Sequence, residues 1–184
     1  MTRVIAGLAR GRKLAVPRTG VRPTGDKARG ALFNSLGSLL ELEGAAVLDL
    51  YAGSGALGLE ALSRGARSVL FVESGGGVLP VLRANLAAVG LPGGRVQAGS
   101  VPTVVAGTAS ERFDLVLADP PYATPAEEVL EVLGSLVRGG WLAPDAVVVV
   151  ERGRRDEPWE WPTPLTGLRD RRYGEAVLRY GRSS

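Results

Sequence analysis

The sequence predicts an α/β fold, with a mainly parallel sheet that ends in a C-terminal antiparallel hairpin and is preceded by a small N-terminal β-ribbon and a helix. Three observations support this prediction. Strand-like and helix-like stretches alternate from Ala45 onward, which is typical of a parallel sheet covered by helices. A glycine-rich turn at 52–58 joins an apolar run to a helical one. Two β-like segments meet at Tyr173-Gly174, near the end of the chain.

The first part of the chain, residues 1–44, is expected to form an appendage to a main domain at residues 45–184. Short β-like runs at Arg3–Ala6 and Lys13–Val16 predict a basic ribbon. A helix is expected next, and it should dock on the main domain through one apolar face, which carries Ala28, Leu32, Leu36 and Leu39.

Elements of the main domain alternate along the chain. The strand candidates are Ala46–Leu50, Ser68–Glu73, Arg95–Gln97, Phe113–Ala118 and Ala146–Glu151, and the helix candidates are Leu57–Arg64, Val78–Val89, Val101–Ala106 and Pro125–Val137. The tail then predicts the hairpin, with arms at 165–172 and 175–180. The chain length of 184 residues suits one domain with an appendage.

The composition excludes several kinds of chemistry. With no cysteine and no histidine, the chain lacks disulfides, thiolate nucleophiles, histidine bases and the usual zinc ligands, so we assign no metal site. No apolar run is long enough to span a bilayer, and the first residues lack a secretory signal, so we expect a cytoplasmic protein without membrane contact, and a monomer. Catalysis must therefore use carboxylates, hydroxyls, amides or a cofactor.

Basic residues gather near both ends of the chain. The net charge is +3 and the calculated pI is about 9.7, which favours a polyanionic partner, although a solvated arginine-rich surface is the alternative. In the ribbon the basic side chains flank a glycine in a segment too polar to be core, and we assign them to RNA phosphates. The residues assigned to RNA are Arg10, Arg12, Lys13 and Arg22.

Ligands of open α/β sheets bind beyond the carboxyl ends of the strands, and three predicted strand ends carry unusual residues. Asp49 precedes the glycine turn, where Gly53 and Gly55 allow a ligand to approach the backbone and the next helix presents free N–H groups. Glu73 ends the second strand, where its carboxylate can accept both hydroxyls of a ribose. Asp119-Pro120-Pro121-Tyr122 follows the fourth strand.

Two cofactors fit a glycine turn of this kind. The glycines satisfy GxGxxG and Glu73 follows about 20 residues later, as in a nucleotide-dependent dehydrogenase. S-adenosylmethionine carries an ammonium, a sulfonium and a ribose, and it suits carboxylates at Asp49 and Glu73 better than a pyrophosphate does. We therefore favour S-adenosylmethionine and keep the NAD-type oxidoreductase as the alternative.

The tetrapeptide Asp119–Tyr122 is the most specific signal in the chain. Its two prolines fix the backbone and remove two donors, which leaves outward carbonyl acceptors. A carbonyl and the Asp119 carboxylate can together bind both hydrogens of an exocyclic amino group, while Tyr122 stacks on the base. A rigid turn without a catalytic role is the structural alternative.

Taken together, these residues resemble the RsmD-type ribosomal RNA guanine-N2 methyltransferases. The resemblance is carried by 49–66, by Asp119–Tyr122, by Arg22-Pro23-Thr24 before 26–36, and by the basic segment Gly7–Leu14. It implies a Rossmann-like methyltransferase domain that binds S-adenosylmethionine and methylates N2 of a guanine in 16S ribosomal RNA, either as free RNA or within a small subunit or assembly intermediate.

The resemblance also implies residue roles. It places the catalytic motif at Asp119, Pro120, Pro121 and Tyr122, and the cofactor contacts at Asp49, Ala52, Gly53, Ser54, Gly55, Glu73, Ser100 and Thr24. Two positions depart from the family pattern: Ser100 stands in place of the usual acidic adenine ligand, and Gly30 replaces a glutamate. A catalytically silent RNA-binding protein of the same fold is a third hypothesis.

Overall fold

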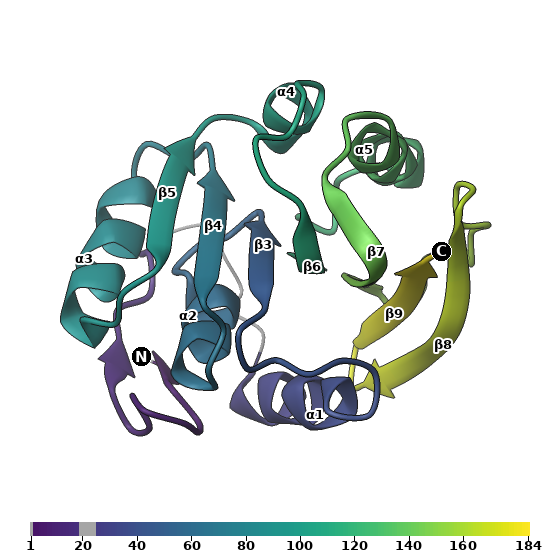
Figure 1. Ribbon diagram of the computed structural model, residues 1–184. Coiled ribbons are helices and arrows are strands. Elements are labelled where there is room, and N and C mark those ends of the chain that lie inside the picture. Colours follow the sequence, from purple (N-terminus) through teal and green to yellow (C-terminus); the bar gives the residue numbers. More distant parts are fainter. Residues whose placement is uncertain (1, 19–24) are drawn as a thin grey trace.

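The computed structural model describes residues 2–18 and 25–184. Within these residues, none of the helices combines the length and the apolar character that a membrane span requires. Figure 1 shows a central sheet with helices on both faces, and the two-stranded N-terminal ribbon lies at one side, below the sheet. The ribbon pairs β1 (Thr2–Arg3) with β2 (Lys13–Leu14) in antiparallel register, which confirms the predicted ribbon in a shorter form.

The main sheet has seven strands in the order β5-β4-β3-β6-β7-β9-β8. The first five in this order are parallel, and β9 and β8 add antiparallel strands at one edge, as the sequence predicted. The strands are β3 (Ala46–Leu50), β4 (Ser68–Glu73), β5 (Gly94–Ala98), β6 (Phe113–Ala118), β7 (Leu142–Gly153), β8 (Leu165–Tyr173) and β9 (Ala176–Ser183).

Helices cover both faces of the sheet because its central strands are apolar on both sides. One hydrophobic cluster joins the ribbon and the first three helices to one face, through strand residues such as Val47, Phe71 and Leu117. The other cluster joins the remaining helices to the opposite face, through residues such as Leu48 and Val116. The helices are α1 (Asp26–Leu36), α2 (Ala56–Ser63), α3 (Leu79–Val89), α4 (Val101–Val105) and α5 (Ala126–Arg138).

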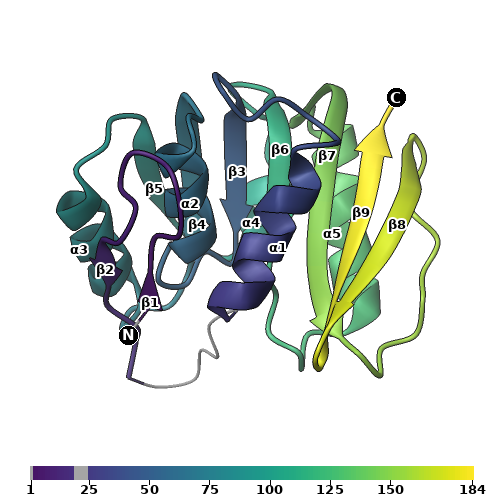
Figure 2. The ribbon, with the colours of Figure 1, turned by 90° about the horizontal axis from the view of Figure 1, so that it is seen from below.

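The predicted appendage packs directly on the main domain. Leu32, Phe33 and Leu36 of α1 and Leu14 of the ribbon belong to the same hydrophobic cluster as the sheet, so α1 docks as predicted. Figure 2 shows the ribbon and α1 next to each other on one side of the sheet. Hydrophobic contacts thus cross the boundary proposed at residues 44 and 45, and the division into two units stays a prediction.

The inward face of α1 differs from the predicted one by the inclusion of an arginine. Arg29 is completely buried, whereas Ala28 is only partly buried. The Nη2 of Arg29 donates to Thr2 Oγ1 and to the Arg3 carbonyl. The Nε of Arg29 lies 3.9 Å from Oε2 of Glu60, which is also fully buried. Glu60 in turn accepts the backbone N–H of Ile5 at 2.8 Å. A buried, paired charge thus joins α1, α2 and the ribbon.

The strand register brings the predicted functional strand ends to one edge. Leu50 of β3 pairs with Val72 of β4 on one side and with Ala118 of β6 on the other. Glu73 and Asp119 each follow these partners by one residue, so they flank the end of β3. The carboxyl edge of the sheet therefore carries both groups next to the glycine turn.

Candidate functional site at the carboxyl edge of the sheet

The glycine turn between β3 and α2 needs its glycines for two different reasons. Gly53 and Gly55 have φ values of +58° and +85°, which side chains with a Cβ rarely adopt. A Cβ on Gly55 would also lie 2.5 Å from Leu82 Cδ1, and one on Gly58 would lie 2.3 Å from Phe71 Cε1. The turn is consequently close-packed from behind, and its backbone faces the carboxyl edge without side chains.

Glu73 binds this turn from the neighbouring strand. Its Oε2 accepts the Gly53 N–H at 2.8 Å, and its Oε1 accepts the N–H groups of Ser74 at 3.1 Å and Gly75 at 2.9 Å. Three of the roughly four lone-pair sites of the carboxylate thus accept backbone N–H groups, and the remaining site is on Oε2. Glu73 therefore fixes the conformation of the turn in addition to lining the pocket described below.

Asp49 lies behind the turn rather than in front of it. The residue is only 1% exposed, and its Oδ2 accepts the Gly58 N–H at the start of α2 at 2.9 Å. Burial raises the pKa of Asp49 well above its usual value, the Gly58 hydrogen bond opposes this shift, and the charges of Asp119 and Glu73 add to it. Its predicted contact with the cofactor stays a prediction.

Ala52, Ser54 and Gly55 hold the turn together through their backbone. The Ala52 N–H donates to the Val72 carbonyl at 3.0 Å, and its carbonyl accepts the Gly55 N–H at 2.8 Å. Ser54 is only 6% exposed, and its carbonyl accepts a hydrogen bond from the Asn85 side chain at 2.9 Å. The three residues are therefore part of the cradle, and their predicted contacts with a cofactor remain to be tested.

A pocket of about 380 Å³ opens between the glycine turn and the tetrapeptide. It brings together the predicted residues Gly53, Glu73 and Asp119–Tyr122, from three segments that are far apart in the sequence. Tyr122 leaves 46% of its surface exposed beside it, as a ring that stacks on a base must. The lining residues are Tyr51, Gly53, Glu73, Ser74, Asp119, Pro120, Pro121, Tyr122, Ala123 and Glu151.

Four of the lining residues were not among the predicted site residues, and two of these four carry clear structural features. Glu151, near the end of β7, is 7% exposed and accepts the Tyr122 hydroxyl at Oε1 over 3.2 Å. Tyr51 has the left-handed φ of +58° that β-carbon-bearing residues avoid, and burial raises the pKa of its hydroxyl to about 12. Glu151 ends an apolar run of valines, the same signal that singled out Glu73.

A buried amide connects the ribbon to the cofactor cradle. Asn85 of α3 is 3% exposed, accepts the Ala15 N–H at 2.8 Å, and donates to the carbonyls of Ala15 and Ser54 at 2.9 Å each. All of these partners are backbone groups, so the side chain fixes two segments at once. Sequence periodicity gave no signal for it, because one asparagine on a helix is usually exposed.

The predicted RNA-binding residues of the ribbon are exposed. Arg10 and Lys13 point to solvent, and Arg12 is exposed while its Nη1 donates to the Ala88 carbonyl of α3 at 3.3 Å. Arg22 lies outside the described residues, as does Thr24, the predicted cofactor contact. The RNA contacts of this surface stay a prediction.

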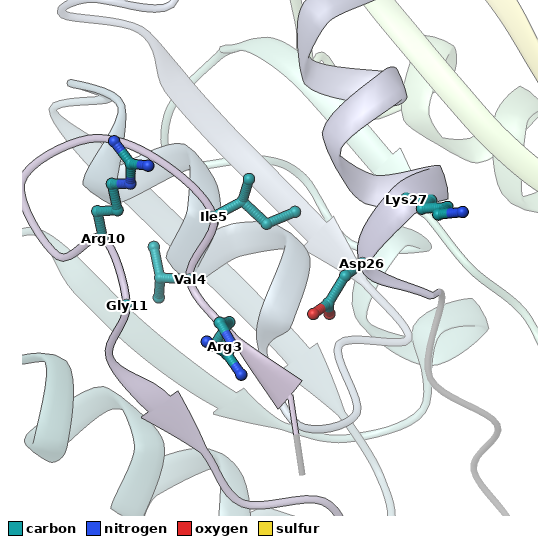
Figure 3. Close-up of a pocket in the computed structure, with 7 residues that line it drawn as sticks. All are labelled: Arg3, Val4, Ile5, Arg10, Gly11, Asp26 and Lys27. Atoms are coloured by element: carbon teal, nitrogen blue, oxygen red, sulfur yellow. The ribbon is translucent and has the colours of Figure 1, made fainter.

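A second cavity, also of about 380 Å³, lies between the ribbon and the first turn of α1 (Figure 3). Arg3 and Arg10 line it from the ribbon, and Lys27 lines it from α1. Asp26 also lines the cavity, and its carboxylate is paired within the protein, because Arg29 Nη2 donates to Asp26 Oδ1 at 3.1 Å. The cavity therefore extends the basic surface of the ribbon toward α1.

Ser100, a predicted cofactor contact, has another role in the structure. Its hydroxyl caps α4, where Oγ accepts the Thr103 N–H at 3.3 Å and donates to Thr103 Oγ1 at 2.7 Å. The side chain is exposed and does not line the pocket at the carboxyl edge. The contact of Ser100 with the cofactor remains a prediction.

Comparison with known proteins places this geometry among methyltransferases. A family model described as "Conserved hypothetical protein 95" matches residues 2–182. The Ribosomal RNA small subunit methyltransferase D of Haemophilus influenzae is 36% identical over 181 residues, which are 96% of this chain and 91% of the relative. Its namesake in Escherichia coli K12 is 40% identical over 150 residues, which are 81% and 73% of the two chains.

Solved structures agree with the sequence relatives. The structure of the methyltransferase yhhF from Escherichia coli has a TM-score of 0.87 and 35% identity, and the match covers 100% of this chain and 98% of that one. A Thermus thermophilus protein of unassigned function has a TM-score of 0.80 and 32% identity, with 98% of each chain covered. The similarity therefore extends over the ribbon, α1 and the C-terminal hairpin together.

Proposed function

Because the chain belongs to the RsmD family of ribosomal RNA small subunit methyltransferases, we propose that it transfers a methyl group from S-adenosylmethionine to N2 of a guanine in 16S ribosomal RNA. Family membership decides against the nucleotide-dependent oxidoreductase that shares the glycine pattern. A catalytically silent RNA-binding protein is the alternative that an activity assay has to exclude.

The single observation that carries this proposal is the joint lining of one pocket by Gly53, Glu73 and Asp119–Tyr122. The first two residues supply a cofactor cradle, and the tetrapeptide supplies acceptors and a ring for an amino-bearing base. A methyltransferase needs these two halves in contact, because the donor and the acceptor must meet in one water-poor space. An RNA-binding surface alone requires neither.

The residues at the turn fit S-adenosylmethionine by their shape and charge. Positive φ angles at Gly53 and Gly55 and close packing behind Gly55 form a backbone cradle. Beside it, Glu73 presents a carboxylate whose remaining acceptor site can take a ribose hydroxyl. Glu73 and Asp119 bring carboxylates to the pocket, which suits a cationic ligand, whereas Asp49 is buried behind the turn. When bound, S-adenosylmethionine supplies an electrophilic methyl group.

The protein's own contribution to the reaction is orientation. In our proposal Asp119 and a carbonyl of the tetrapeptide accept the two hydrogens of the guanine amino group, so its lone pair is directed toward the cofactor cradle. Tyr122 stacks on the base. No strong base is required, because the nitrogen becomes acidic only after it is methylated, and the Asp119 carboxylate is then positioned to accept the proton.

The target guanine must leave its base stack to reach this pocket, because a stacked base cannot present its amino group to a recessed site. The exposed side chains of Arg10, Arg12 and Lys13 are proposed to bind phosphates around the extruded nucleotide. We propose that one copy of the chain acts in the cytoplasm, on RNA within a small subunit or an assembly intermediate.

The proposal is tested by identifying the methylated nucleoside. Small subunits from a strain that lacks this protein are incubated with the purified chain and methyl-labelled S-adenosylmethionine, and the RNA is digested and mapped by mass spectrometry. We expect one N2-methylguanosine in 16S RNA. Label in adenosine would contradict the guanine assignment, and absence of label in both free RNA and particles would favour the silent RNA-binding protein.

A further inference from the structure

Glu151 is placed to recognise the base that the pocket receives. The residue precedes the end of β7, is 7% exposed and lines the pocket together with the tetrapeptide. On the proposed function, we infer that the Glu151 carboxylate accepts the N1–H of the target base and so selects guanine over purines that lack this hydrogen.

The sheet register accounts for the position of this carboxylate. Ala118 of β6 pairs with Val150 of the parallel neighbour β7, and Asp119 and Glu151 each follow that pair by one residue. The two acids therefore extend from neighbouring strands into one pocket. If Asp119 at the end of β6 holds the amino group of the base, the adjacent ring nitrogen N1 faces a side chain on one of the two strands that flank β6.

The chemistry of purine edges makes this arrangement selective. Guanine carries donors on adjacent atoms, N1–H and the N2 amino group, so it matches two neighbouring carboxylates. In a 2-aminopurine or an adenine, N1 carries a lone pair, which a carboxylate repels. An ionised carboxylate accepts hydrogen bonds and donates none, so Glu151 cannot form a hydrogen bond with N1 of 2-aminopurine or adenine.

The hydrogen bond from Tyr122 is compatible with this role. The Tyr122 hydroxyl donates to Glu151 Oε1 at 3.2 Å, and a carboxylate has about four lone-pair sites over its two oxygens. The same bond links the base-edge group to the ring that stacks on the base. This hydrogen bond also allows a competing explanation, in which Glu151 only orients Tyr122 and does not contact the base.

A base analogue separates the two explanations. Small-subunit RNA is reconstituted with either guanine or 2-aminopurine at the modified position, because 2-aminopurine keeps the N2 amino group but has no N1–H. Single-turnover methyl transfer is then compared for the wild type, Glu151→Gln and Tyr122→Phe. The glutamine amide can donate to a bare N1, and Tyr122→Phe removes the hydroxyl contact while keeping the Glu151 charge.

We expect the wild type to prefer guanine, and Glu151→Gln to reduce the guanine to 2-aminopurine rate ratio by about 10- to 100-fold, the range for a hydrogen bond to a charged group. Part of that change should be a gain of rate on 2-aminopurine, which a merely structural role does not produce. Tyr122→Phe should keep the wild-type ratio. If the glutamine variant folds poorly, Glu151→Ala, which removes the carboxylate, should lower the ratio in the same direction.

Two results would overturn the inference while leaving the proposed function in place. One is a wild-type rate ratio in Glu151→Gln, or in Glu151→Ala where the glutamine variant does not fold. The other is an equal shift of the ratio in Tyr122→Phe, which would make Glu151 a positioning residue for the tyrosine. Failure of the wild type to methylate guanine would instead overturn the proposed function and this inference with it.

Discussion

Replacing Glu73 by glutamine should reduce both the stability of the cofactor-free protein and its affinity for S-adenosylmethionine. The carboxylate accepts three backbone N–H groups, one on Oε2 and two on Oε1. A glutamine amide has one oxygen, so its NH₂ must face a backbone donor in either orientation. The less costly orientation retains the Ser74 and Gly75 bonds and sacrifices the bond to Gly53.

The expected magnitude follows from that single lost bond. A hydrogen bond to a charged group contributes about 1.5–3 kcal/mol, and the Gly53 N–H at 2.8 Å is left facing another donor. Because this part of the site is only partly buried, water can replace some of the interaction. We therefore expect a loss of about 1–3 kcal/mol in the free energy of unfolding, with a similar loss in cofactor binding.

Two measurements separate the effects. Urea denaturation without cofactor reports the stability of the turn, and calorimetric titration with S-adenosylmethionine reports binding. Glu41→Gln, which changes an exposed carboxylate, is the matched control and should alter neither quantity. An unchanged unfolding free energy in Glu73→Gln would refute the structural role of this carboxylate, and an unchanged affinity would remove it from the cofactor site.

Three further changes test other parts of the structure. Replacing Arg10, Arg12 and Lys13 together by alanine should flatten the slope of log affinity for RNA against log salt, measured by filter binding, because fewer phosphates are neutralised. Asn85→Leu leaves three backbone partners without their side-chain contact and should lower the free energy of unfolding by about 2–4 kcal/mol in urea titrations. Asp49→Asn should gain stability relative to the wild type as the pH rises, in cofactor-free unfolding experiments. The folded-state pKa of Asp49 is raised above 3.8, so its favourable contribution is complete below that pH and is lost as the pH rises through the folded-state pKa.

Each of these expectations has its own control. Arg83→Leu, at an exposed position of the same helix as Asn85, should be nearly neutral, and an equal loss in both variants would remove the special role of the amide. A salt slope that the triple alanine variant does not change would make the ribbon a purely structural element. A parallel pH dependence of wild type and Asp49→Asn would show that Asp49 titrates normally in the folded protein.

Strand positions were largely predictable because the central sheet is buried on both faces. The observed bounds of β3, β4 and β6 coincide with the expected Ala46–Leu50, Ser68–Glu73 and Phe113–Ala118. In β7 the sequence signal began only at Ala146, whereas the strand begins at Leu142. Pro144 and the left-handed Asp145, with φ of +60°, interrupt the apolar pattern at an irregularity in the β6–β7 pairing, which lies between the pairs Phe113–Leu142 and Leu115–Val147.

The pocket was only partly predictable, because its remaining members depend on tertiary contacts. Gly53, Glu73 and Asp119 stand out as polar or flexible residues at the ends of apolar runs. Glu151 stands at a comparable strand end, but only the β6–β7 pairing places it beside Asp119. The burial of Arg29 was not predictable either, since only one of its two carboxylate partners, Asp26, lies on the same helix, whereas the fully buried Glu60 lies on α2.

The most direct test of the catalytic assignment is single-turnover methyl transfer to small-subunit RNA by Asp119→Ala. The side chain is proposed to align the nucleophile and not the cofactor, so this variant should bind S-adenosylmethionine nearly as the wild type does and lose most of its turnover. Tyr122→Ala should also lose most turnover, whereas Tyr122→Phe keeps the stacking ring and should retain most of it. Methyl transfer by Asp119→Ala at a near-wild-type rate would contradict the proposed mechanism and leave Asp119–Tyr122 as a rigid turn without a catalytic role.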